Sequence, residues 1–109
     1  INMLGDLKGM MAQLKNAQVK IEETKKRLDT VLVDGKAGNG RVTVAVTANR
    51  EVRTIRIEEK LFSDKEALED YLILALNKEM KKANEIHEME MARAAKDGLP
   101  DLPGLDMFK

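Results

Sequence analysis

The glycine-rich stretch of residues 34–44 is the first pattern that could do chemistry. It reads Asp-Gly-Lys-Ala-Gly-Asn-Gly-Arg-Val-Thr-Val, and closely spaced glycines can let a backbone approach a phosphate. A phosphate-binding loop of this kind leads into a helix and ends in a Lys-Ser/Thr pair. No such pair follows Gly40, and Val42, Val44 and Val46 instead alternate with other residues as in a strand. The stretch therefore predicts a hairpin in which glycines supply positive φ.

His87 is the second feature that could do chemistry, because Glu85, Glu88 and Glu90 lie near it in the sequence. This spacing is not the two-histidine pattern of a helical zinc site, so we expect a surface or interface histidine. The chain has no cysteine, and no spacing recommends a Ser-His-Asp triad. We therefore predict no catalytic, metal or cofactor-binding residues, no small-molecule substrate and no enzyme activity.

The third feature is a set of basic side chains that could neutralise phosphates of a nucleic acid. The formal net charge is zero, with 19 basic and 19 acidic residues, which argues against a generic nucleic-acid binder. Residues 1–29 nevertheless carry six basic and four acidic groups. No aromatic residue is interleaved with the basic ones, so stacking on single strands is not expected. The candidates for contacts with duplex DNA are Lys8, Lys15, Lys20, Lys25, Lys26, Arg27, Lys78, Lys81, Lys82, Arg93 and Lys96.

Length and composition limit the elements that can position these residues. At 109 residues the chain is expected to form one domain with a thin core, which oligomerisation would help to complete. The absence of cysteine fits a reducing compartment. No apolar run approaches the roughly 18 residues of a membrane span, and no signal peptide is visible. We therefore expect no membrane association.

Two long helices are predicted, over about Met3–Asp29 and from Ser63 onward. In the first, an apolar residue recurs every seven positions, at Leu7, Leu14, Ile21 and Leu28. This seam is narrow and indicates packing of one helix on another. In the second, Ser63 and Glu66 form a potential capping box, and the apolar stripe runs through Leu68, Leu72, Leu76, Met80 and Ala83.

Three strands are predicted between the helices, at Thr30–Gly35, Arg41–Ala48 and Glu51–Glu58. Their short connections, including a tight turn at Asn49-Arg50, favour an antiparallel meander. Ile55 and Ile57 would share one face, with Arg53 nominally beside them. The wetter face would carry Arg41, Thr43, Thr47, Thr54 and Arg56. That face is either simply solvated or turned toward a partner.

The lengths of these elements predict protruding arms. A helix of about 30 residues is about 45 Å long, whereas a strand of about seven residues is about 23 Å long. Each helix must therefore overhang the sheet, and the two overhangs can pack antiparallel, which would place Met10 near Met91. We predict an α+β fold of long helix, three-stranded antiparallel meander and long helix, as a dimer with protruding helical arms. Residues 1–96 would form the single domain, followed by a tail with proline and glycine at 97–109.

The order of these segments resembles the bacterial YbaB/EbfC family of nucleoid-associated proteins. The resemblance rests on Gly35–Val44, on Asp64–Asp70, on Ala75-Leu76-Asn77, on Met10, Met11, Gln13 and Gln18 in the first helix, and on Leu102-Pro103-Gly104-Leu105. It implies a homodimer with tweezer-like helical arms. It also implies binding to double-stranded DNA with weak or variable sequence preference, in the cytoplasm on the nucleoid.

Two functions follow as hypotheses. The first is a nucleoid-associated protein that binds double-stranded DNA as a homodimer, mainly through phosphates, and that bridges or reshapes DNA and affects gene expression. The alternative is a dimeric protein-interaction module that uses its arms as a clamp and binds no DNA. The neutral charge favours the second hypothesis, and the family resemblance favours the first.

Overall fold

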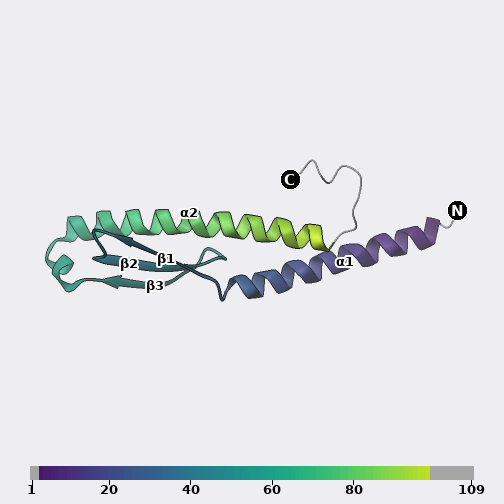
Figure 1. The fold of residues 1–109 in the computed structure, drawn as a ribbon, viewed down its shortest axis with the longest axis horizontal. Helices are drawn as coiled ribbons and strands as arrows, with labels where there is room; N and C mark the ends of the chain where they lie inside the picture. The colour runs from purple at the N-terminus through teal and green to yellow at the C-terminus, as the bar shows by residue number, and fades with distance from the viewer. Residues whose placement is uncertain (1–2, 99–109) are drawn as a thin grey trace.

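The computed structural model describes residues 3–98, in which two long helices accompany a three-stranded sheet (Figure 1). The elements are α1 (Met3–Leu28), β1 (Leu32–Ala37), β2 (Val42–Thr47), β3 (Val52–Ile57), the 3-10 helix η1 (Glu59–Ser63) and α2 (Lys65–Asp97). The strands form an antiparallel sheet in the order β1-β2-β3. This confirms the predicted α+β meander between two helices. The tail predicted for residues 97–109 lies outside the described residues beyond Gly98.

Both predicted hairpin turns are present. Between β1 and β2, Gly38, Asn39 and Gly40 have φ values of 62°, 57° and 87°, so the glycine stretch supplies positive φ, as expected. The turn between β2 and β3 also lies where it was predicted, but its left-handed residue is Arg50, with φ of 67°, and not Asn49. Asn49 instead donates from Nδ2 to the Lys25 carbonyl, at 2.7 Å. Its amide therefore ties this turn to the end of α1.

The core lies between α2 and the first two strands. Val42 and Val44 are fully buried with Leu61 and Ala75. The opposite face of β2 is drier than expected, because Thr47 is also fully buried. The Thr47 hydroxyl accepts hydrogen bonds from the backbone amides of residues 49 and 51, which satisfies it inside the turn. Its predicted place on a wet face is therefore wrong.

A β-bulge in β3 explains why Arg53 lies in sequence beside apolar residues that face α2. The register shifts between Ala45 and Val46, so that Val52 pairs with Val46 and Ile55 pairs with Val44. Val52 and Ile55 therefore share the α2 side of the sheet, and Arg53 is the extra residue between them. The Arg53 Nη2 atom lies 3.4 Å from the Asp29 carbonyl oxygen.

Three predicted boundaries need correction. β1 ends at Ala37 and not at Gly35, because its pairing with β2 continues to Ala37 opposite Val42. β1 begins two residues later than expected, because Thr30 belongs to the turn that closes α1 and its hydroxyl donates to the Arg27 carbonyl at 2.6 Å. The N-cap of α2 is Asp64 and not Ser63. Asp64 Oδ1 accepts from the Ala67 amide at 3.2 Å, whereas Ser63 ends η1 and donates to the Lys60 carbonyl. The helix cap therefore lies one residue after the predicted capping box.

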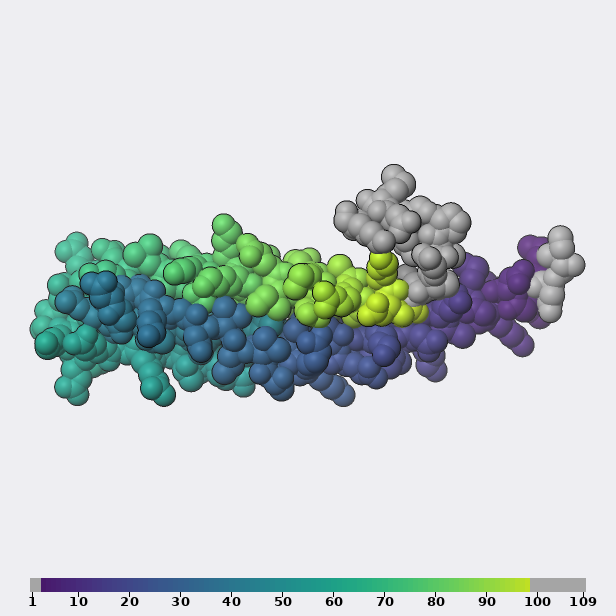
Figure 2. All heavy atoms as spheres, in the orientation of Figure 1, coloured from purple at the N-terminus to yellow at the C-terminus, as the bar shows by residue number. Residues whose placement is uncertain are grey.

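The two helices pack antiparallel beyond the sheet and form the arm, defined here as residues 17–28 of α1 with residues 83–98 of α2. Gly98 packs directly on the backbone of Ala17, which sets the register. Met10 therefore lies beyond the end of α2, and the expected pairing of Met10 with Met91 is wrong. Figures 1 and 2 show the beginning of α1 extending past the end of α2.

One charged residue lies in the middle of the apolar stripe of α2. Glu79 is fully buried, and its carboxylate packs on Gly35 of β1, where a Cβ atom would overlap it. Lys82 Nζ lies 3.5 Å from Glu79 Oε1, and neither carboxylate oxygen has a hydrogen-bond partner among residues 3–98. Gly35 is therefore required by the bulk of Glu79.

We expect Gly35→Ala to lower the free energy of unfolding by about 1–3 kcal/mol, as overpacking of a closed core does. The matched control is Gly9→Ala on α1, where a Cβ meets nothing within 4 Å and the helix should gain about 0.5–1 kcal/mol. Urea denaturation followed by circular dichroism measures both changes. Equal unfolding midpoints for the two variants would contradict the assigned contact.

Candidate nucleic-acid interface

The eleven predicted phosphate-binding residues do not form one cluster. They lie on both helices of a molecule that measures 75 × 25 × 15 Å. Helical geometry, at about 100° per residue, separates them into two rows and two isolated residues. The rows differ in what they face and in whether carboxylates already engage their members.

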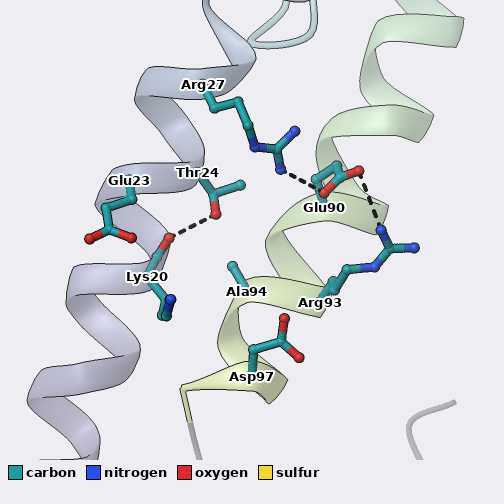
Figure 3. A pocket seen from close by; sticks show the side chains of 8 residues that line it. All are labelled: Lys20, Glu23, Thr24, Arg27, Glu90, Arg93, Ala94 and Asp97. Atoms are coloured by element: carbon teal, nitrogen blue, oxygen red, sulfur yellow. Dashed lines mark hydrogen bonds and ion pairs between the residues drawn. The ribbon is translucent and has the colours of Figure 1, made fainter.

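A polar cleft runs between the helices of the arm and brings together three of the predicted residues (Figure 3). It has a volume of about 310 Å³ and is lined by Lys20, Glu23, Thr24, Arg27, Glu90, Arg93, Ala94 and Asp97. Three basic and three acidic residues therefore line it, with the Glu23 carboxylate directed away from α2 (Figure 3). The cleft itself is balanced in charge and is not a ready-made anion site.

Glu90 organises this cleft. Its side chain is only 16% exposed, and its Oε2 atom lies 2.8 Å from Arg27 Nη2. Its other oxygen lies 3.7 Å from Arg93 Nη1, so two guanidinium groups from different helices converge on one carboxylate (Figure 3). Glu90 thus links α1 to α2, and it competes with any phosphate for both arginines.

The cleft-side row continues from the arm along α2. On α2, Lys78, Lys82, Arg93 and Lys96 fall within about 60° of one another around the helix axis. On α1, Lys20 and Arg27 are about 20° apart, and both line the cleft. We name as the cleft-side row the six residues Lys20, Arg27, Lys78, Lys82, Arg93 and Lys96. Three of them, Lys20, Lys78 and Lys96, form no ion pair within residues 3–98.

The outer row consists of Lys8, Lys15 and Lys26. These residues lie within about 20° of one another and about 140–180° from Ala17 and Leu28, the buried residues of α1. They are therefore on the side of α1 opposite α2, and all three are exposed. The two remaining candidates are isolated, since Lys25 pairs with Glu22 at 3.6 Å and Lys81 is on the back of α2.

Comparison with known proteins decides the family. The model of the YbaB/EbfC DNA-binding family matches residues 3–99 of this chain. The chain belongs to this family. It is 50% identical over 105 residues to a nucleoid-associated protein of Flavobacterium johnsoniae, covering 95% of this chain and 99% of the relative. A nucleoid-associated protein of Afipia carboxidovorans is 38% identical over 106 residues, with 95% and 99% coverage.

A solved structure also shares the YbaB/EbfC-type fold of this chain. The crystal structure of an uncharacterized protein from Helicobacter pylori superposes with a TM-score of 0.62 and 27% sequence identity. The match covers 69% of this chain and 89% of the other. Over that part of the chain, the fold described above is therefore found in a solved protein.

His87 has a structural place in this member of the YbaB/EbfC family. Its Nδ1 atom lies 3.2 Å from the Ala48 carbonyl oxygen, and its Nε2 atom lies 3.3 Å from Arg50 Nη2. A neutral ring with the proton on Nδ1 satisfies both contacts. Arg50 also donates to Asn84 Oδ1 at 2.9 Å. These bonds fasten α2 to the β2–β3 turn within one chain.

The residues that sequence reasoning missed are the acidic partners. Glu79 and Glu90 engage Lys82, Arg27 and Arg93, and the only signal for Glu79 was its place inside an apolar stripe.

No group of three or more His, Cys, Asp or Glu side chains suited to a metal ion occurs within the described part of the chain. No helix in residues 3–98 is long and apolar enough to cross a membrane.

Proposed function

We propose that this protein is a nucleoid-associated protein that binds double-stranded DNA as a homodimer, mainly through phosphate contacts. The observation that carries the proposal is the match to the YbaB/EbfC DNA-binding family over residues 3–99. The names of its relatives, both nucleoid-associated proteins, support a place on the nucleoid in the cytoplasm of a bacterium. Bridging or reshaping of DNA, with effects on gene expression, would follow from two arms in one dimer.

The arrangement of basic residues supports recognition of the phosphate backbone. The cleft-side row extends over 18 residues of α2 from Lys78 to Lys96, which is about 27 Å along the helix. Duplex DNA carries one charge per about 1.7 Å of its axis, so a row of this length can meet several phosphates. The row is made of long flexible side chains with no aromatic residue among them, and such contacts position a protein without reading bases.

An exposed apolar surface supports the homodimer. α2 covers β1 and β2, and the α2-facing side of β3 leaves Val52 and Ile55 43% and 44% exposed. Ile73 of α2 is also exposed. It lies on the same flank of α2 as His87, which is 14 residues further along the helix. His87 in turn contacts the β2–β3 turn. We propose that a second copy covers Val52, Ile55 and this flank of α2.

We expect Ile55→Glu to convert the dimer to a monomer at micromolar concentration, because a carboxylate would be buried without a partner. The matched control is Leu32→Glu, since Leu32 is similarly exposed, at 52%, but lies on the other face of the sheet. Sedimentation equilibrium measures both. A wild-type protein that sediments only as a 12.2 kDa species would contradict the proposed dimer.

Binding of two unrelated duplexes tests the proposed mode of recognition. Fluorescence anisotropy with labelled duplexes of equal length and different sequence should give dissociation constants within about tenfold of each other, because phosphate contacts carry no sequence information. A preference of about 1,000-fold or more, as typical specific sites show over non-specific DNA, would mean that bases are read directly. Absence of binding to both would favour the protein-clamp alternative.

A further inference from the structure

The first half of α1 carries an apolar face that no described residue covers. Residues 3–16, here called the overhang, bear six large apolar side chains that are each more than half exposed: Met3, Leu4, Leu7, Met10, Met11 and Leu14. Leu7 and Leu14 continue the seven-residue seam whose last member, Leu28, is fully buried in the arm. The same face of one helix is thus covered at its end and bare at its beginning.

The covered part of the seam stops where α2 ends. The Gly98 amide donates to the Ala94 carbonyl at 3.1 Å, and Gly98 packs on the backbone of Ala17. Because the helices are antiparallel, α2 ends pointing toward the N-terminal half of α1 (Figure 1). The chain therefore continues from a point directly beside the first uncovered turn of the seam.

The sequence that follows has a pattern suited to this face. Apolar residues recur at every third position, at Leu99, Leu102, Leu105 and Phe108, with prolines at 100 and 103. A polyproline II helix has three residues per turn and rises about 3.1 Å per residue, which would place these four side chains on one side about 9.3 Å apart. The seam of α1 repeats every seven residues, or about 10.5 Å, so the two spacings nearly match.

We propose that the tail after Gly98 docks along the overhang of the same chain through its first half, residues 99–104, with Leu99 against Leu14 and Leu102 against Leu7. Fourteen residues of helix separate Ala17 from Met3, about 21 Å, and eleven extended residues reach about 34 Å. The tail would thus cover the apolar face of α1 that lies beyond the end of α2.

The tether at Gly98 favours this occupant over a second copy of the chain. A segment joined by a few residues to its docking face has an effective concentration in the millimolar range. A separate copy at micromolar concentration would have to displace it. Lys8 and Lys15 lie about 100° around α1 from Leu7 and Leu14, so they flank the seam on which the tail docks.

Disulfide trapping tests the docking directly, because the natural chain has no cysteine. Under mild oxidation, the double variant Leu7→Cys/Leu102→Cys should form an intrachain disulfide about tenfold faster than Lys8→Cys/Leu102→Cys, at a rate unchanged by dilution. Lys8 is the matched control because it directly follows Leu7 in the chain but is turned by about 100° around α1 from the seam. Equal rates for the two variants would overturn the proposal. Disulfides formed mainly between chains would also overturn it and would assign the overhang to a second copy.

Hydrogen exchange gives a second readout that does not depend on introduced cysteines. Truncation after Gly98 should speed amide exchange in residues 3–16 several-fold and leave exchange in β2 unchanged, because only the overhang would be uncovered. Unchanged exchange throughout the overhang would show that nothing was docked there.

Discussion

Replacing Lys20, Lys78 and Lys96 together by Gln is expected to weaken binding to duplex DNA by on the order of a hundredfold at about 0.1 M salt. The reason is that each phosphate neutralised by the protein contributes about 0.9 to the slope of log K against log salt, here called the salt slope. These three members of the cleft-side row form no ion pair within residues 3–98, so their removal should not unbalance the fold. The weakening should be the same for all sequences. The slope of log K against log salt should become shallower by about 0.9 for each phosphate that is no longer neutralised.

The control for this prediction is a second triple variant with the same change in net charge. Lys36, Lys60 and Lys65 are lysines on β1, η1 and the start of α2, away from both rows. Their replacement by Gln should leave the salt slope unchanged. If the two triple variants weaken binding equally, general charge and not the cleft-side row would determine affinity.

The basic run at residues 25–27 is a less informative target than the cleft-side row. Replacing Lys25, Lys26 and Arg27 by Ala should also weaken binding to all sequences about equally and flatten the salt slope. Two of these residues, however, already pair with carboxylates, Lys25 with Glu22 and Arg27 with Glu90. The change in the slope should therefore be smaller than for the three lysines of the cleft-side row.

The second large effect is a gain of DNA binding. Glu90→Gln removes the carboxylate that engages Arg27 at 2.8 Å and Arg93 at 3.7 Å. Each guanidinium released to a phosphate should steepen the salt slope by about 0.9 and raise the affinity by roughly tenfold or less at moderate salt. Titration of a labelled duplex at several salt concentrations measures both quantities.

Glu88→Gln provides the control for the gain. Glu88 pairs at 3.8 Å with Arg50, which belongs to neither row, and the substitution makes the same change in net charge. It should leave the slope unaltered. If Glu90→Gln binds no more tightly than Glu88→Gln, the arginines of the cleft do not contact DNA.

Most of the fold could be predicted from local patterns in the sequence. Heptad spacing from Leu7 to Leu28 indicated helix-on-helix packing, and alternation at Val42–Val46 with flanking glycines indicated a hairpin. These features depend on short periods, of seven residues in the helix and two in the strand, which survive without tertiary information. The errors lie where two local solutions compete, as at Ser63 and Asp64, since either residue can cap a helix.

The register of the arm and the partners of the basic residues could not be predicted in the same way. Whether Met10 or Ala17 lies opposite the end of α2 depends on where the turn at Thr30 and the bulge at Arg53 place the helices, and such offsets accumulate along the chain. Ion pairs such as Arg27 with Glu90 join residues 63 positions apart. A basic residue that looks free in the sequence is therefore partly neutralised in the fold.

The central claim is that this member of the YbaB/EbfC family binds duplex DNA through phosphates, and a mobility shift across a salt series tests it most directly. The intact protein should shift duplexes of any sequence at low salt. Its log K should fall linearly with log salt, with a slope of about −0.9 for each phosphate contacted. No shift at low salt, at protein concentrations well above the weak affinities of non-specific binders, would contradict the account and leave the arms as a clamp for a protein partner.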